Sequence, residues 1–213
     1  MNSIYESQVF SILSEIANLN FFKPCINERY LHHYFTMKIQ KVYPIVYEDV
    51  RKGKLHPEWA TAIKDYRNGG KYQKVGNEYK IKDGNGTTGY IDFVLGDYDN
   101  PEMGIEFKCN RSWNFQSLVF DYMKLMDRNN SIQKVISFSI IYREKDHSNK
   151  LPLELNGTID KLTKRLGNRM DNKREFLFWI LEIAPNSCNS KKVKSWYCND
   201  LEYKFQEKMP LCD

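Results

Sequence analysis

Two carboxylates and one amine stand close together in a stretch of otherwise apolar sequence. Asp92 lies in the segment GYIDFVLGD, and Glu106 and Lys108 lie in the segment GIEFKCN that soon follows. Because side chains alternate along a β-strand, Glu106 and Lys108 point to the same face of their strand. Charged groups inside apolar strands are costly unless a partner compensates them. We therefore expect these three side chains to share a partner.

A hard divalent cation suits this set of side chains. Mg²⁺ is held in proteins by one or two carboxylates together with water and phosphate oxygens. We expect Asp92 and Glu106 to share the ion, with Lys108 beside the attacking water. The ion would neutralise the charge that builds on the phosphate oxygens and on the leaving group. The pattern thus predicts hydrolysis of phosphodiester bonds.

The same three residues also have a purely structural interpretation. An acid followed by Glu-x-Lys is a loose pattern, and a salt bridge between two strands would produce it as well. The order of the surrounding segments favours chemistry. A turn, a strand with Asp92, a second turn and a strand with Glu106 and Lys108 precede an amphipathic helix.

Hydrophobic periodicity predicts the elements that position these residues. Apolar residues at helical spacing predict helices over residues 5–19, 27–42, 115–126 and 158–168. Alternating or continuous apolar runs predict strands over residues 78–82, 89–95, 104–109, 133–142 and 176–183. The first two strands flank DGNGTTG and are expected to form a hairpin, whereas residues 45–75, which include LHPEWAT, look irregular. Strands that cluster before a helix and continue after it predict a mixed sheet flanked by helices.

Composition places the chain among ordinary globular proteins. Its 213 residues, 41% of them hydrophobic, suit a single domain over 1–213, with a core at about 27–183, an N-terminal helix and a C-terminal extension. The net charge of +5 fits a polyanion-binding surface without requiring one. Five cysteines without a CxxC pair exclude a zinc ribbon, and with an N-terminus unlike a secretory leader they favour a cytoplasmic location. No run of about 20 apolar residues occurs, so we expect no membrane association.

Asp92, Glu106 and Lys108, on consecutive predicted strands, resemble the motif of the PD-(D/E)xK nuclease superfamily. The resemblance covers about residues 27–142. It implies an α/β (α+β) restriction-endonuclease-like fold, in which a mixed β-sheet is flanked by α-helices and carries the site at one end. It also implies cleavage of DNA, less often of RNA, with Mg²⁺ or Mn²⁺ as the cofactor. Ile91 replaces the proline of the family motif, a departure that is common in the group.

A further acid joins the predicted site through the same resemblance. Many family members carry a glutamate on the helix before the sheet, close to the metal. Glu28 has that position, directly after the expected N-cap Asn27. A glutamate in the first helical turn is also favoured by the helix dipole alone. His32 follows Glu28 by four residues and could share a ligand with it, but we interpret His32 as an ordinary, partly buried histidine.

Three residues are candidates for contact with nucleic acid. Arg111 and Trp113 follow the strand of Glu106, where an arginine can bind phosphate and an aromatic ring can stack on a base. Lys124 lies off the apolar stripe of the next helix and could also meet a phosphate. The alternatives are that Trp113 anchors the start of this helix in the core and that Lys124 is a solvated lysine.

These observations predict a metal-dependent nuclease that acts on DNA. Its catalytic residues are Asp92, Glu106, Lys108 and Glu28, and its metal ligands are Asp92 and Glu106. A homodimer is compatible with this class of enzyme. Two alternatives stay open: a nuclease fold that binds nucleic acid or a protein partner without cleavage, and a protein whose strand charges are structural. The complete motif argues against a silent module, because binding alone does not need all three residues.

Overall fold

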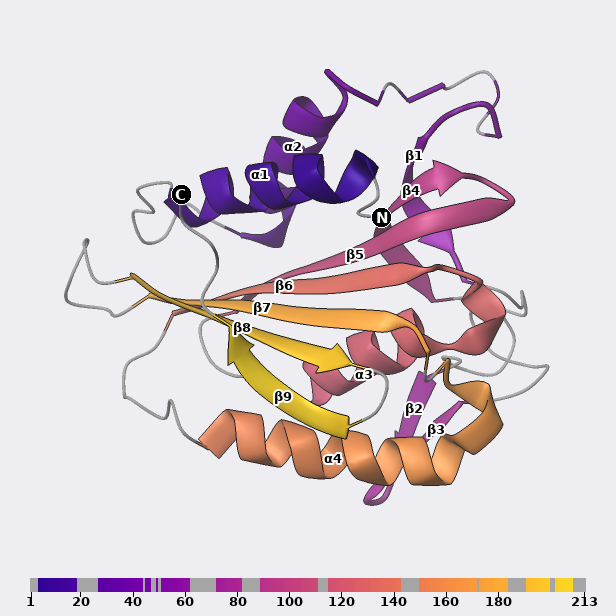
Figure 1. Ribbon diagram of the computed structural model, residues 1–213, viewed down its shortest axis with the longest axis vertical. Coiled ribbons are helices and arrows are strands. Elements are labelled where there is room, and N and C mark those ends of the chain that lie inside the picture. The colour runs from indigo at the N-terminus through magenta and orange to yellow at the C-terminus, as the bar shows by residue number, and fades with distance from the viewer. Residues whose placement is uncertain are drawn as a thin grey trace.

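The computed structural model arranges the chain in three layers (Figure 1). A seven-stranded sheet lies in the middle, and helices cover both of its faces. This arrangement confirms the expected mixed sheet flanked by helices. The structure describes residues 4–18, 27–43, 45–46, 49, 51–61, 72–81, 89–110, 115–142, 150–171, 173–183, 191–199 and 202–208.

The large sheet is mixed in direction. Its central strands β5, β6 and β7 run parallel, whereas the other neighbouring strands are antiparallel. The chain passes from β5 to β6 through α3, and from β6 to β7 through α4, with both helices on the same face (Figure 1). Two successive crossovers of the same hand require that placement. In spatial order the strands are β1 (Leu55–Ala60), β4 (Tyr90–Asp97), β5 (Asn100–Asn110), β6 (Lys134–Tyr142), β7 (Glu175–Ile183), β8 (Lys191–Asn199) and β9 (Glu202–Lys208).

Two pairs of helices enclose the sheet. On one face, Phe35 of α2 packs against Phe93 and Phe107, with ring centroids 4.9 and 5.2 Å away. On the other face, Tyr122 of α3 packs against Phe176 at 5.0 Å. Since both faces of the central strands are buried, their sequences are almost continuously apolar. The helices are α1 (Ile4–Asn18) and α2 (Glu28–Ile39) on the first face, and α3 (Phe115–Met126) and α4 (Lys150–Leu166) on the second.

The helix boundaries agree with the sequence pattern at some ends and differ at others. Asn27 is the N-cap of α2, and its Oδ1 accepts a hydrogen bond from the Tyr30 N–H at 3.0 Å. The same helix ends at Ile39, before the predicted 42, and α4 begins at Lys150, well before the predicted 158. Among the helices of the described residues, none combines the length and the apolar character that a membrane span requires.

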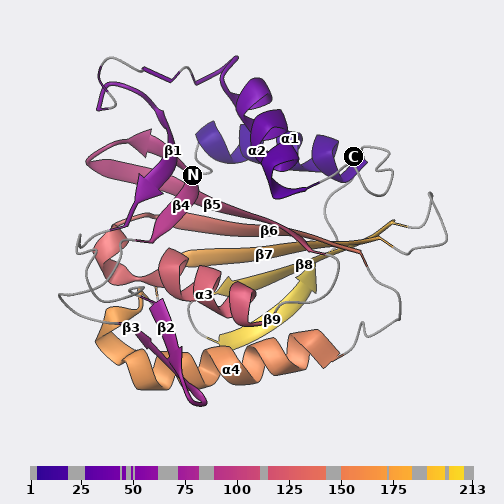
Figure 2. The same cartoon turned by 180° about the vertical axis from the view of Figure 1, so that it is seen from behind.

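The region between α2 and β4 contains more strand than its pattern predicts. β2 (Tyr72–Val75) and β3 (Glu78–Ile81) form a separate hairpin beside α3 and α4 (Figure 2). The predicted hairpin between residues 78–82 and 89–95 is therefore wrong, because β4 pairs with β1 and β5 instead. Gly76 suits the turn between β2 and β3, since it adopts a positive φ of 60° without steric cost.

The prediction that residues 45–75 are wholly irregular is also wrong. The stretch LHPEWA forms β1, which among the described strands pairs with β4 alone and is an edge of the large sheet. Pro57 is compatible with this strand, because proline is tolerated at a sheet edge, where one side of the strand needs no partner. The C-terminal tail, which has no clear pattern, supplies β8 and β9. The short 3₁₀ helices η1 (Arg128–Asn130) and η2 (Gly167–Arg169) complete the described elements.

Candidate functional site

The predicted site residues lie where β4 and β5 separate. The ladder between these strands extends inward from their connecting turn to the pair Phe93 and Ile105. Beyond that pair, β4 continues beside β1 as far as Tyr90, while β5 continues beside β6 as far as Asn110. Backbone groups at such a fork need other partners, because an unpaired buried N–H or C=O is costly.

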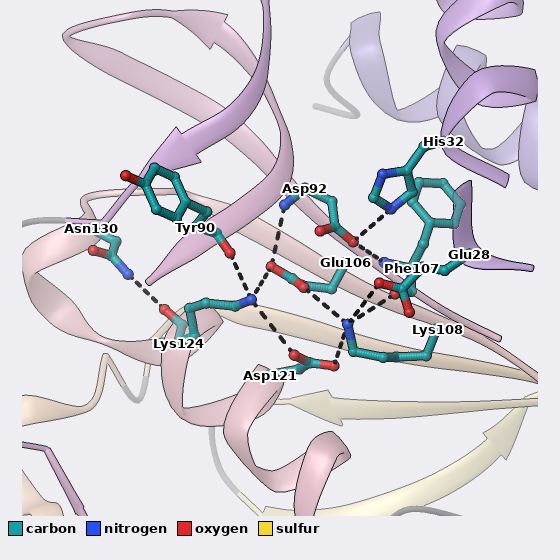
Figure 3. Close-up of polar contacts among 10 residues, drawn as sticks. All are labelled: Glu28, His32, Tyr90, Asp92, Glu106, Phe107, Lys108, Asp121, Lys124 and Asn130. Atoms are coloured by element: carbon teal, nitrogen blue, oxygen red, sulfur yellow. Dashed lines mark hydrogen bonds and ion pairs between the residues drawn. The ribbon is translucent and has the colours of Figure 1, made fainter. Parts of the chain in front are cut away.

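Side chains of the site take over hydrogen bonds at this fork (Figure 3). The Phe107 N–H donates to Asp92 Oδ2 at 2.7 Å, and the Asp92 N–H donates to Glu106 Oε1 at 3.3 Å. Lys124 Nζ donates to the carbonyl oxygen of Tyr90 at 2.7 Å. Asp92 and Glu106 are thus each held by the backbone of the other's strand. The fork itself fixes where both carboxylates lie.

Lys108 lies among acids from three elements. Its Nζ is 3.6 Å from Glu28 Oε1 on α2 and 3.7 Å from Glu106 Oε2 on its own strand. Asp121 Oδ2 on α3 is also 3.7 Å from the same nitrogen. The structure therefore brings Glu28, Glu106 and Lys108 together, as the sequence predicts. Asp121 was missed, although an acid among the apolar residues Leu118, Val119 and Tyr122 of an amphipathic helix is itself a signal.

Lys124 lies inside the site rather than in solvent. Its side chain is only 14% exposed, and its Nζ is 2.6 Å from Glu106 Oε1. The same nitrogen is 3.6 Å from Asp121 Oδ1, one helical turn earlier on α3. The interpretation of Lys124 as a solvated lysine is therefore wrong, because the neighbouring acids draw its ammonium group inward. Lys124 and Lys108 hold the Glu106 carboxylate from two sides (Figure 3).

Burial dominates the acid–base behaviour of the inner acids. The pKa of Glu106 is raised well above its ordinary value, because full burial disfavours the charged form more than Lys124 favours it. The pKa of Asp121 is raised for the same reason. Burial alone would lower the pKa of Lys108, but the surrounding acids, Asp121 first, outweigh it and raise the pKa. The lysines stay charged while the inner acids are reluctant to ionise.

Asp92 behaves differently from the inner acids. Burial acts to raise its pKa, but His32, Lys108 and the Phe107 N–H outweigh that effect and leave the pKa below its ordinary value. Burial likewise acts to lower the pKa of His32, but the neighbouring carboxylates, Asp92 first, raise it overall. Asp92 is therefore an anion across the neutral range.

His32 stands directly beside Asp92, a position that its helical spacing did not reveal. Its Nε2 is 3.2 Å from Asp92 Oδ2. One ligand atom from each of Glu28, His32 and Asp92 lies within 4.8 Å of the others. Among the described residues, this group is the one whose ligand atoms converge closely enough to surround a metal ion. The sequence identified two of its three members as site residues.

Glu58 of β1 is a further charged neighbour that the sequence did not single out. The register places it opposite Asp92, between the pairs Pro57–Phe93 and Trp59–Ile91. Its φ of 50° is uncommon for a residue other than glycine. Its negative charge acts on His32. The segment LHPEWAT thus brings another acid to the edge of the site.

The donor set suits a divalent cation. Four carboxylates, from Glu28, Asp92, Glu106 and Asp121, face two lysines. Within the described part of the chain, Glu106 Oε2 and Asp121 Oδ2 are buried and accept no hydrogen bond. Carboxylate oxygens that accept no hydrogen bond are suitable ligands for hard divalent ions, which take oxygen ligands.

Two predicted site residues cannot be placed relative to this cluster. Arg111 and Trp113 lie outside the described residues. Their contacts with phosphate and base stay predictions. Residues 82–88, which precede β4 in the sequence, also lie outside the described residues.

Comparisons with known proteins add no assignment. No protein-family model, curated protein or solved structure matches this chain. The class of protein must therefore be inferred from the chemistry of the site itself.

Proposed function

We propose that this protein is a metal-dependent nuclease that hydrolyses phosphodiester bonds of DNA on a restriction-endonuclease-like core. The proposal rests mainly on one observation: Asp92, Glu106 and Lys108 converge where two strands separate. Glu28 of α2 lies beside them. A salt bridge that served only stability would not require four acids around two lysines, with buried oxygens on Glu106 and Asp121 that accept no hydrogen bond from the described residues.

The residues divide into those that hold the ion and those that handle the substrate. Asp92 and Glu106 are the proposed ligands of Mg²⁺ or Mn²⁺, with Glu28 beside them. The bound ion supplies a Lewis acid that polarises the phosphate and favours ionisation of water. Asp92 enters as a ready anion because its pKa is lowered. Glu106 can be recruited because the positive charge of an ion lowers a carboxyl pKa.

Lys108 is the proposed partner of the attacking water. Its ammonium lies at the centre of the acids and stays protonated, so it can donate hydrogen bonds but not accept a proton. It can therefore orient water for attack and stabilise the negative charge that develops on phosphate oxygens. A fixed cation aimed at developing charge is the most effective form of such stabilisation, because the site does not have to reorganise.

Lys124 holds the Glu106 carboxylate from the opposite side. Its 2.6 Å contact restrains Oε1, whereas Oε2 accepts no hydrogen bond from the described residues, lies 3.7 Å from Lys108 Nζ and is the oxygen that would face an ion. Its second bond, to the carbonyl of Tyr90, ties α3 to β4. Lys124 is a positioning residue in this scheme and contacts neither substrate nor ion.

Cleavage of plasmid and of single-stranded and double-stranded oligonucleotides, with Mg²⁺, with Mn²⁺ and with EDTA, tests this function. We expect cleavage by the wild type with metal and none with EDTA. Asp92→Asn should abolish it. The matched control is Asp97→Asn on the same strand, whose carboxylate pairs with Lys54 at the surface. Salt-dependent DNA binding without turnover in every metal would overturn the nuclease and leave a binding module.

A further inference from the structure

The cluster next to Asp92 contains an imidazole, and this changes which ion the site should prefer. Glu28 and His32 are one turn apart on α2, so their side chains leave the same face of the helix. Both reach Asp92 on β4, and the three ligand atoms lie within 4.8 Å of one another. Two carboxylates and one imidazole from a helix and a strand therefore converge on one point (Figure 3).

His32 is held in place by aromatic packing. The edge of its ring meets Phe93 at a centroid distance of 5.3 Å, and Phe107 lies 5.7 Å away. Only 23% of the side chain is exposed. The ring therefore has little freedom to leave Asp92, and the cluster is preorganised rather than assembled by an ion.

The ligand atom of His32 is also chemically available. Nε2 is buried and forms no hydrogen bond of good geometry with any described residue, although Asp92 Oδ2 lies 3.2 Å away. A buried polar atom without a hydrogen bond calls for an explanation. A metal ion accepting the Nε2 lone pair would satisfy it.

We propose that His32, with Glu28 and Asp92, makes this a mixed nitrogen–oxygen centre that selects a first-row transition ion such as Mn²⁺ or Co²⁺ over Mg²⁺ and Ca²⁺. Imidazole nitrogen suits transition metals, whereas Mg²⁺ and Ca²⁺ take oxygen ligands. The inference deepens the proposed function by naming the ion that occupies the same site, and metal binding tests it without cleavage.

The first experiment is calorimetric titration of Mn²⁺, Co²⁺, Mg²⁺ and Ca²⁺ into wild type, His32→Gln and His33→Gln. His33 is the matched control because it is adjacent on α2 but exposed. We expect wild type to bind Mn²⁺ more tightly than Mg²⁺. We expect His32→Gln to weaken Mn²⁺ by at least roughly tenfold, the scale seen when groups around a metal centre are lost. Its affinity for Mg²⁺ should change little, and His33→Gln should match the wild type.

A spectroscopic measurement on the wild type guards against a variant that merely folds poorly. Pulsed electron paramagnetic resonance of the Mn²⁺-loaded protein should show coupling to an imidazole nitrogen. The coupling should vanish in His32→Gln and persist in His33→Gln. Absence of nitrogen coupling in the wild type would overturn the inference, as would unchanged metal selectivity in His32→Gln.

The outcomes separate this inference from the nuclease proposal. Mn²⁺ binding that depends on His32, with no cleavage of any nucleic acid, would support the metal centre and remove the nuclease. Cleavage that proceeds equally with Mg²⁺ and Mn²⁺, and that His32→Gln leaves unchanged, would support the nuclease and remove the mixed centre.

Discussion

Asp92 and Glu106 are carboxylates on neighbouring strands, yet the fold treats them in opposite ways. Asp92 accepts a backbone N–H and lies beside His32, and its pKa is lowered. Glu106 is fully buried between two lysines, and its pKa is raised because burial outweighs their attraction. The fold stabilises one anion and destabilises the other. Two residues that look equivalent in a motif can therefore contribute to stability with opposite sign.

The difference has a simple physical origin. Asp92 lies on the side of the fork that faces α2 and the edge strand, where the Phe107 N–H donates to it and the His32 ring lies beside it. Glu106 lies on the side that faces α3, where Asp121 adds a second buried acid. Lysine charge compensates these acids only in part, since Glu106 Oε2 and Asp121 Oδ2 accept no hydrogen bond from the described residues. An ion would remove this deficit.

Loss of either carboxylate should cause the largest decrease in cleavage activity, and the decrease should be similar for Asp92 and Glu106. Asp92→Asn and Glu106→Gln should each reduce kcat/KM for metal-dependent DNA cleavage by roughly 10²–10³-fold or more, the scale for losing one electrostatic contact to a transition state. Glu102→Gln on the same strand as Glu106 serves as control. Steady-state cleavage of a labelled duplex measures the effect. Retained activity in either variant would break the proposed ligand pair.

Removal of Lys124 should produce the largest loss of stability. Lys124→Met leaves Glu106 Oε1 and the Tyr90 carbonyl oxygen without their donor, and each buried acceptor that loses its hydrogen bond costs about 1–3 kcal/mol. Urea denaturation measures the free energy of unfolding. In the double variant Lys124→Met with Glu106→Gln, part of that loss should be recovered, because no ionisable group is then left at position 106 without its cation. If the changes in the free energy of unfolding of the two single variants simply add in the double variant, Lys124 and Glu106 are not energetically coupled.

Replacing each carboxylate by its neutral amide should change the free energy of unfolding in opposite directions for Asp92 and Glu106. Asp92→Asn should lower the free energy of unfolding by about 1–3 kcal/mol at pH 7, the scale for hydrogen bonds to a charged group. Glu106→Gln should raise it, because the amide resembles the neutral form that the folded state prefers, and Lys124 keeps Asp121 and the Tyr90 carbonyl. Both variants are compared by urea denaturation without metal. A shift of the same sign in both would remove the contrast.

The smallest expected effect is on the pH dependence of stability. Glu106 has a raised pKa when folded, so its contribution is present below the unfolded value of about 4.3 and is lost as pH rises through the folded pKa. Asp92 has a lowered pKa, so its contribution is present above about 3.9 and is lost as pH falls through the folded pKa. As the pH falls through the folded pKa of Glu106 toward about 4.3, the wild type should therefore gain stability relative to Glu106→Gln. Relative to Asp92→Asn, it should lose stability only at still lower pH.

The sequence predicted which residues meet in the site better than it predicted how the helices and strands pack. Alternation on one strand placed Glu106 and Lys108 together, because local periodicity fixes which face a side chain takes. Glu28 was expected near them only through the resemblance to the nuclease family. The partners Asp121, Lys124 and His32 depend on how α2 and α3 pack across the sheet, which no local period encodes. The wrong hairpin has the same cause. β3 had two possible neighbours, and only the tertiary fold chooses between them.

Pro57 and Glu58 also affect how the edge of the sheet can interact with other polypeptides. β1 is an edge strand, and its backbone lacks an N–H at Pro57 and leaves the extended conformation at Glu58. A second polypeptide could not add a regular ladder along such a strand, so this edge resists aggregation through strand addition. The same irregularity leaves the flank of Asp92 with one short strand beside it. Protection against self-association and access for a long, charged substrate would then come from the same two residues.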